Sequence, residues 1–231
     1  FRHAGLRDES SVATTSGTAL SIPTAEPHDY VYATDGDKYV KIDMSSEVPE
    51  VSQWIGPYST VKGVKFGNTN FASLIAKFNS RLALSGVKSN PTNFFLSAIN
   101  DPYDWIPSSG STVSVDALAG SSGTKFGEIG DNIKALIPVG SSGLLFGCQN
   151  SMSILTNDPV FSDAQIRQVS RSVGCLGPRA FTKVGEMGVL IASSQGVFGI
   201  DPNTFDIERG SRLTRDKLDR LVAQTDFEDT N

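Results

Sequence analysis

The sequence predicts an all-β protein built from β-propeller-like repeats of about 45 residues. Three observations favour this fold. Segments that combine apolar strands with polar turns recur along the chain, apolar residues of two such segments match at one offset, and three of the segments end in Asp-Pro. Regularly spaced short strands are also typical of a β-sandwich, which is the alternative fold.

The recurring segment consists of an apolar strand, a tight polar turn and a second strand with alternating apolar residues. It occupies residues 30–43, 81–102, 143–159 and 188–202. In the last copy, Phe198 and Ile200 stand two apart, which is the period of a strand with one buried face. Gly, Ser, Asn and Asp fill the turns, because these residues tolerate the backbone angles of tight turns. Each copy therefore predicts a β-hairpin.

A common offset relates two of the copies. A shift of 45 residues aligns Leu136 with Phe181, Val139 with Val184 and Leu145 with Leu190. If Val31 and Ala83 are the equivalent positions in the first two copies, the spacings are 52, 62 and 45 residues. A single unit cannot bury both of its faces, so the repeat predicts sheets stacked around an axis. From this alignment we expect an inner-strand core that includes Val31, Leu82, Leu84, Leu145, Leu190 and Ile191.

Asp-Pro pairs close three of the copies, at residues 101–102, 158–159 and 201–202. Proline has no N–H group for a sheet ladder, and an aspartate carboxylate can accept a hydrogen bond from the backbone that follows it. The pair is therefore predicted to end the strand and begin a turn.

The longest spacing has a local cause in residues 106–125, which are rich in Ser and Gly. We expect a loop insertion here, with a short edge strand at residues 112–115. The few apolar residues of the loop cannot form a core of their own. Val113, Val115 and Leu118 are therefore candidate subunit contacts, for which a neighbouring copy supplies the packing.

The chain divides into three parts. Residues 1–28 form a polar N-terminal extension, residues 29–210 hold the β-propeller-like repeats, and residues 211–231 are predicted to be a short C-terminal helix and tail. Thr214 is a suitable N-cap for this helix, and Leu218, Leu221 and Val222 fall on one face. Four hairpins are few for a closed ring. Either a degenerate unit lies near the N-terminus, or the repeat domain is part of a longer chain.

Composition and charge narrow the classes of partner. Of the 231 residues, 39% are hydrophobic and 19% are charged, which is typical of a globular protein. The net charge is -5 and no cluster of Lys and Arg is present, so we expect no face that neutralises nucleic-acid phosphates. No apolar run approaches the roughly 20 residues that span a bilayer. Cys148 and Cys175 are too few for a disulfide framework, and we expect both thiols to be unpaired.

The sequence holds few residues for catalysis or metal binding. His3 and His28 are the only histidines, and neither has a Cys, Asp or Glu at metal-ligand spacing. Asp35 and Asp37 fit a hairpin turn better than a calcium loop, because no third acidic residue follows in register. Cys175 has no histidine near it in sequence to activate a thiolate. We therefore expect no enzymatic activity and no cofactor.

An aromatic turn, NDPYDW at residues 100–105, suggests an alternative function. Tyr103 and Trp105 are candidate residues for stacking on a sugar ring, as in a lectin-like or receptor-binding β-propeller module. Large aromatic residues also fill the gap between neighbouring sheets, and the sequence alone allows both roles.

Three stretches share a pattern with a known family. They read NSRLALSGVKSNPTNFFLSAINDPYDW at residues 79–105, IKALIPVGSSGLLFGCQNSMSILT at 133–156 and RSVGCLGPRAFTKVGEMGVLIASSQGVFGID at 171–201. The first combines an Arg-Leu strand, a short turn, Asn-Pro, an aromatic strand and Asp-Pro with an aromatic residue. Together they resemble the tail tubular or nozzle-type β-propeller structural proteins of short-tailed bacteriophages. The likeness covers roughly residues 70–205.

The resemblance implies a structural virion component, made in the host cytoplasm and located in the phage tail. Proteins of this type form a ring of identical subunits, a homohexamer, around the channel through which DNA leaves, and they contact other tail or connector proteins. DNA passes without sequence-specific binding, no catalytic residues come with the family, and no membrane span is implied. At 231 residues, the chain is shorter than a full nozzle protein, which carries additional platform domains.

Overall fold

The computed structural model describes most of the repeat region. The described residues are 24–25, 29–54, 60–61, 64–65, 71–105, 118–120, 129–140, 142–159, 164–184 and 188–207. Every regular element in these residues is a β-strand, which confirms the predicted all-β class. The strands are β1 (Thr24–Ala25), β2 (Tyr30–Thr34), β3 (Tyr39–Asp43), β4 (Glu50–Gln53), β5 (Thr60–Val61), β6 (Val64–Lys65), β7 (Leu74–Phe78), β8 (Arg81–Val87), β9 (Asn90–Leu96), β10 (Leu118–Gly120), β11 (Ile133–Val139), β12 (Gly143–Cys148), β13 (Met152–Thr156), β14 (Gln165–Ser170), β15 (Phe181–Lys183), β16 (Val189–Ser193) and β17 (Gly196–Ile200).

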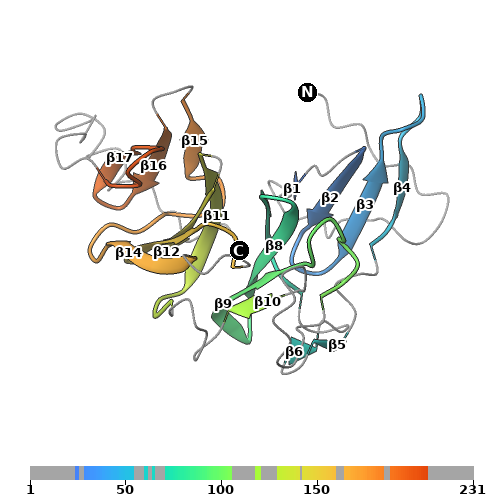
Figure 1. The fold of residues 1–231 in the computed structure, drawn as a ribbon, viewed down its shortest axis with the longest axis horizontal. Helices are drawn as coiled ribbons and strands as arrows, with labels where there is room; N and C mark the ends of the chain where they lie inside the picture. The colour runs from blue at the N-terminus through green and yellow to red at the C-terminus, as the bar shows by residue number, and fades with distance from the viewer. Residues whose placement is uncertain are drawn as a thin grey trace.

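The strands form four antiparallel sheets in chain order, and each sheet pairs only consecutive strands. Sheet 1 consists of β1–β4, sheet 2 of β7–β10, sheet 3 of β11–β14 and sheet 4 of β15–β17, while β5 and β6 make a separate ribbon. Figure 1 shows the four sheets along an arc, with β4 near one end and β17 near the other. The first strand of sheet 2, β7, contacts the first strands of sheets 1 and 3. The fold is therefore a β-propeller-like series of blades.

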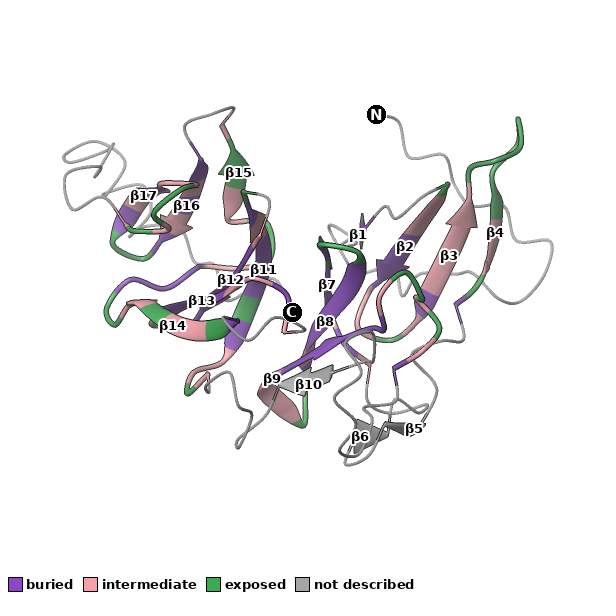
Figure 2. Cartoon of the chain, in the orientation of Figure 1, coloured by how far each residue is buried: buried purple, intermediate pink, exposed green. Residues whose placement is uncertain are grey.

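The two central sheets bury both of their faces. Along β8, Leu82 and Leu84 pack toward sheet 1, whereas Ala83 packs toward sheet 3. In β12, Phe146 packs toward sheet 2 and Leu145 toward sheet 4. Figure 2 accordingly shows β8 almost entirely buried, while β3 is mostly intermediate. In a β-sandwich each sheet would have a single buried face, so the stacking is that of propeller blades and the alternative fold is not adopted.

The register of strand pairing reproduces the offset of 45 residues. Leu136 pairs with Phe146 in sheet 3, and Phe181 pairs with Ile191 in sheet 4. The next hairpins agree, because Leu145 pairs with Ile154 and Leu190 pairs with Gly199, again 45 residues on. Sheets 3 and 4 are therefore copies of one unit at the level of individual residue pairs.

The predicted core is largely confirmed and is wrong at two positions. Leu82, Leu84, Leu145 and Ile191 are buried, whereas Val31 and Leu190 are only partly buried. Tyr32, not Val31, is the residue of β2 that packs toward sheet 2. A slip of one residue moves a side chain to the other face of a strand, so the alignment of the first copy placed the wrong face inward. Leu190 has the right register, but it faces away from sheet 3.

Several predicted features lie outside the described residues. These are the C-terminal helix, the edge strand expected at residues 112–115 and nearly all of the N-terminal extension. Within the expected extension, Thr24 and Ala25 form β1 and pair with β2. Within the expected loop insertion, residues 118–120 form β10, the fourth strand of sheet 2. Residues 24–25 and 118–120 therefore belong to sheets 1 and 2.

The two cysteines are adjacent in the fold. Cys148 ends β12, and the backbone N–H of Cys175 donates to its carbonyl oxygen at 2.8 Å. Both thiols are buried and free. Burial raises the pKa of the Cys148 thiol to about 12, with a further contribution from the charge of Asp131, and burial also raises the pKa of Cys175. Thiolate, the reactive form, is therefore scarce near neutral pH.

We predict that iodoacetamide modifies neither cysteine in the native protein at about pH 8 and modifies both after unfolding. Mass spectrometry of the two digests measures this directly. Because the folded pKa of Cys148 lies above its ordinary value of 9.0, the neutral thiol stabilises the fold below pH 9. This contribution is lost as the pH rises from 9 toward 12. A disulfide-linked peptide pair under non-reducing conditions would contradict the assignment of two free thiols.

Candidate functional site

The joints between neighbouring sheets hold the buried polar groups and the recurring motifs of the chain. In sheets 2, 3 and 4, the turn after the third strand packs back onto the preceding sheet. The docking point lies near the first residue of the second strand of that preceding sheet, which is Tyr30, Arg81 or Gly143. We name the joints 1–2, 2–3 and 3–4 after the sheets that they connect. The first residue of the second strand is thus a docking point for the next sheet in all three joints, and the residue type at this point differs from joint to joint.

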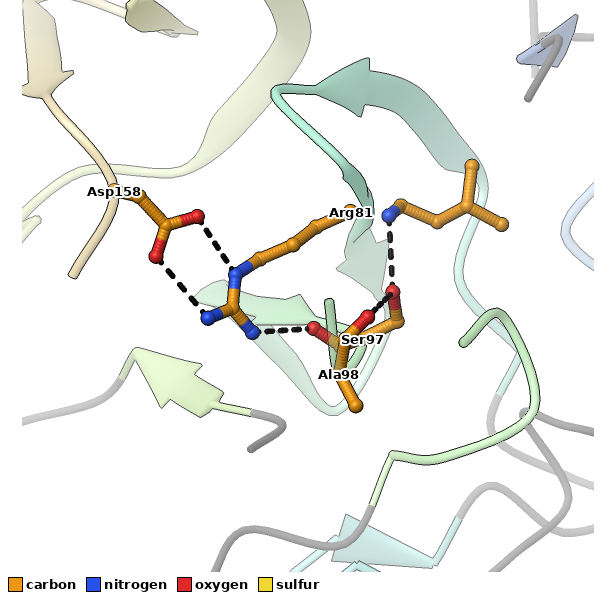
Figure 3. A network of polar contacts seen from close by, with 5 residues as sticks. Arg81, Ser97, Ala98 and Asp158 are labelled. Atoms are coloured by element: carbon orange, nitrogen blue, oxygen red, sulfur yellow. Dashed lines mark hydrogen bonds and ion pairs between the residues drawn. The ribbon is translucent and has the colours of Figure 1, made fainter. Parts of the chain in front are cut away.

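A buried ion pair closes joint 2–3 (Figure 3). The Nε and Nη2 atoms of Arg81 donate to the two carboxylate oxygens of Asp158, at 2.8 and 3.1 Å. The Nη1 atom donates to the carbonyl of Ser97 at 2.7 Å. The Ser97 hydroxyl accepts the N–H of Leu82 and donates to the carbonyl of Ala98, both at 3.0 Å. Arg81 is 2% exposed and Asp158 is 5% exposed, so water is excluded from the pair.

Local sequence positions this pair. Asn157 has a φ of 62° and turns the chain out of β13 immediately before Asp158, while Asn100 has a φ of 56° before Asp101. Asparagine enters this left-handed region more readily than most residues, which gives the Asn of Asn-Asp-Pro a physical role. A two-pronged Arg–carboxylate contact depends strongly on orientation. The pair therefore fixes how sheet 3 sits on sheet 2.

Two tryptophans share one acceptor in joint 1–2. The indole N–H groups of Trp54 and Trp105 both donate to the carbonyl of Pro102, at 3.0 and 2.8 Å. Their rings lie edge to face with centroids 5.8 Å apart. Trp54 and Trp105 are completely or almost completely buried. The Asp-Pro turn of sheet 2 therefore provides the carbonyl that satisfies two large aromatic residues in the core.

A lysine and two tyrosines line the outer part of joint 1–2. The Lys41 ammonium lies 4.5 Å from the ring centroid of Tyr30 and 5.8 Å from that of Tyr103. A hydrogen bond with the Tyr103 side chain raises the pKa of Lys41. Burial raises the pKa of Tyr32, so its hydroxyl stays neutral. Lys41 therefore stays charged and ties the turn of sheet 2 to sheet 1, with about 0.5–1 kcal/mol expected of each exposed cation–π contact.

Joint 3–4 has a glycine, Gly143, at its docking point. A Cβ atom at Gly143 would lie 2.8 Å from the Cε1 atom of Phe205, so glycine leaves the room that this ring occupies. Beside it, Arg167 of β14 donates to the Asp206 carboxylate at 3.2 Å and to the carbonyl of Thr204. This ion pair is largely exposed, and such pairs contribute little. Joint 3–4 is therefore held mainly by apolar packing.

The structure separates the two candidate stacking residues. Tyr103 is 43% exposed at the surface of joint 1–2, whereas Trp105 is buried in the core and fills the space between sheets. Of the candidate subunit contacts, Val113 and Val115 lie outside the described residues, and Leu118 begins β10 opposite Leu96.

Sequence reasoning missed Arg81 and Asp158 as partners. They stand 77 residues apart, and neither residue alone signals an ion pair. One signal was available, because an arginine at the start of an apolar strand such as RLALSGV must find an acceptor once it is buried. No comparable sequence feature indicated that Lys41 would contact Tyr30 and Tyr103.

Two aspartates that follow or end third strands stabilise their own turns by hydrogen bonds. Ser45 donates to the Asp43 carboxylate and the Thr204 N–H donates to that of Asp201, and these bonds lower the pKa of both carboxyl groups. Both stay ionised near neutral pH and are unsuited to donating a proton. Among the described residues, no group of three His, Cys, Asp or Glu side chains could hold a metal ion. The same part of the chain contains no helix with the length and hydropathy of a membrane span.

Comparison with known proteins gives likeness of structure only. No protein-family model matches the chain, and no curated protein matches it. AztD from Citrobacter koseri is 11% identical with a TM-score of 0.48, and the match covers 82% of this chain and 46% of AztD. Hsv2 from Kluyveromyces lactis is 6% identical with a TM-score of 0.45, and the match covers 86% of this chain and 55% of Hsv2. The N-terminal domain of Nup159 is 11% identical with a TM-score of 0.46, and the match covers 87% of this chain and 47% of that domain. The chain thus spans about half the length of these structures.

Proposed function

We propose that this protein is a structural component of a bacteriophage tail, a subunit of a nozzle-type ring through which DNA passes, and that it is not an enzyme. The proposal combines the resemblance of residues 79–105, 133–156 and 171–201 to tail proteins with the position of those residues in the fold. Other tail or connector proteins and identical subunits are its expected partners.

The observation that carries the proposal is the position of the motif residues. Arg81 and Trp105 come from the first resembling stretch, and they lie in joints 2–3 and 1–2. Gly143, from the second stretch, accommodates Phe205 in joint 3–4. The residues on which the resemblance to tail proteins rests therefore hold sheets together. This use of the motifs supports a structural role.

The charge of the chain is compatible with a wall around moving DNA. The net charge is -5, and a subunit that lacks clustered cations repels phosphate rather than gripping it. DNA can then pass without sequence-specific binding and without being retained.

Electron microscopy of the purified protein tests the proposal. The expected result is a ring of identical copies with a central channel wide enough for duplex DNA, and no retention of DNA in a mobility-shift assay at low salt. A carbohydrate-binding module is the second candidate, because Tyr103 is exposed beside Lys41. Saturable binding to a glycan array, lost in Tyr103→Ala, together with the absence of any ring, would overturn the structural proposal in favour of this second function.

The loop contacts give a further prediction. Replacing Val113 and Val115 together by serine should leave the subunit folded and lower the yield of rings, because a neighbouring copy is expected to cover these side chains. Leu118 is left unchanged because β10 begins there. Light scattering measures ring yield, and Thr112→Ser in the same loop is the control. Normal ring yield in the double variant would remove these valines from the subunit contact.

A further inference from the structure

The far face of sheet 1, which points away from sheet 2, is mainly apolar, with the exposed Gln53 opposite Val40 at its edge. Residues paired directly across a sheet share a face, and Val31 pairs with Ile42, Ala33 with Val40 and Ile42 with Val51. Val31, Val40, Ile42 and Val51 are all partly exposed. Among the described residues, the core of joint 1–2 takes from sheet 1 the opposite set, which comprises Ala25, Tyr30, Tyr32, Tyr39 and the adjoining Trp54.

The far face of sheet 4 is mainly apolar too, with the exposed Thr182 opposite Leu190. Leu190 and Ala192 alternate along β16 with the buried Val189 and Ile191, and Ala192 pairs with Val197 of β17. Leu190, Ala192 and Val197 are partly exposed. At the matching position of sheet 3, 45 residues earlier, Leu145 is fully buried against sheet 4. Leu190 thus occupies a position that the repeat buries wherever another sheet follows.

Sheet 1 also presents the docking turn that the joints use. Asp43 ends β3, and its carboxylate accepts the N–H of Ser45 at 2.9 Å. Asp101 and Asp201 accept the N–H two residues ahead in the same manner, at 2.8 and 2.7 Å. In sheets 2 and 4 that turn packs on the preceding sheet. In sheet 1 it leaves Met44 52% exposed and Val48 78% exposed.

We propose that two copies of this chain join head to tail, with the far face of sheet 4 in one copy packed against the far face of sheet 1 in the next. Residues 43–48 of the second copy then dock on sheet 4 as the corresponding turns dock in joints 1–2 and 3–4. The contact continues an interface that the chain already makes three times. This inference concerns how copies meet and does not depend on a place in a virion.

The two faces differ from one another, so the contact is heterologous and each copy contributes both halves. A heterologous contact closes into a ring when the rotation between copies allows it. Two copies bring eight sheets together, which is the upper end of the usual range for propellers of about 4–8 blades. The smallest expected unit in solution therefore has twice the 24.6 kDa mass of one chain, and a six-copy ring would contain three such pairs.

Light scattering during gel filtration tests the contact. The unmodified protein is expected at the mass of two copies, and Leu190→Glu or Ile42→Glu is expected at the mass of one, because each places a carboxylate in an apolar face. Ser194→Glu is the matched control, since Ser194 lies exposed in the turn next to β16 and should leave the mass unchanged. Far-UV circular dichroism establishes that each variant is folded, and Leu190→Gln or Ile42→Gln replaces the corresponding glutamate variant if that variant is not folded.

Mixing the two variants shows whether the contact is head to tail. The Ile42→Glu copy keeps an intact sheet 4, and the Leu190→Glu copy keeps an intact sheet 1, so an equimolar mixture should recover the mass of two copies. A single-chain mass for the unmodified protein would overturn the inference. So would folded face variants that keep the two-copy mass, or a mixture that stays at one copy. A six-copy ring that resists both substitutions would support the proposed function and overturn this contact.

Discussion

Replacing Asp158 with alanine is expected to lower the free energy of unfolding by about 3–5 kcal/mol. The substitution removes the Asp158 carboxylate from beside the Arg81 side chain, which is fully buried in the intact protein, and a buried charge that loses its ion-pair partner costs free energy. Urea denaturation measures the loss. Because the pair is buried, moderate salt should change the result little.

Two controls separate the ion pair from the turn that holds it. Asp101→Ala removes the equivalent aspartate of another Asn-Asp-Pro motif, whose carboxylate is exposed and accepts one backbone N–H from Tyr103. Its expected cost is about 1 kcal/mol. Arg81→Met combined with Asp158→Leu should recover most of the stability lost in Asp158→Ala, since no charge is then buried. Equal costs for the two aspartate variants would contradict a special role for the buried pair.

Leu145→Ala is expected to cost about 2–5 kcal/mol of unfolding free energy. Leu145 is 0% exposed in the core between sheets 3 and 4, and its side chain packs among residues of both. Truncation leaves a cavity that neither sheet can close without shifting against the other. Thermal and urea unfolding both report the change.

Leu190→Ala is the matched control, because Leu190 holds the same place in the repeat 45 residues later. In a dilute sample of single chains its cost should be about 1 kcal/mol, since the side chain is partly exposed. A cost equal to that of Leu145 under those conditions would contradict the exposed position of the far face of sheet 4.

Hairpins, period and strand ends could be predicted from the sequence because they depend on neighbours within a few residues. The alternation in β17, the polar turns and the Asp-Pro stops are local, and the offset between Leu136 and Phe181 appears again as equal strand pairing. The first copy failed by one residue at Val31 because YVYAT offers apolar or aromatic residues on both faces. A local pattern cannot choose the inner face when both faces are suitable.

Composition and motif spacing by themselves determined the all-β class, the repeat and the poor supply of catalytic groups. Only the tertiary structure decided which residues join the sheets. Arg81 and Asp158 lie 77 residues apart, and Trp54 and Pro102 lie 48 residues apart. It also decided that Trp105 fills a core while Tyr103 stays at the surface. The physical reason is that burial and hydrogen-bond partners depend on which sheets stack together, and that stacking brings distant segments into contact without leaving a mark on the local pattern.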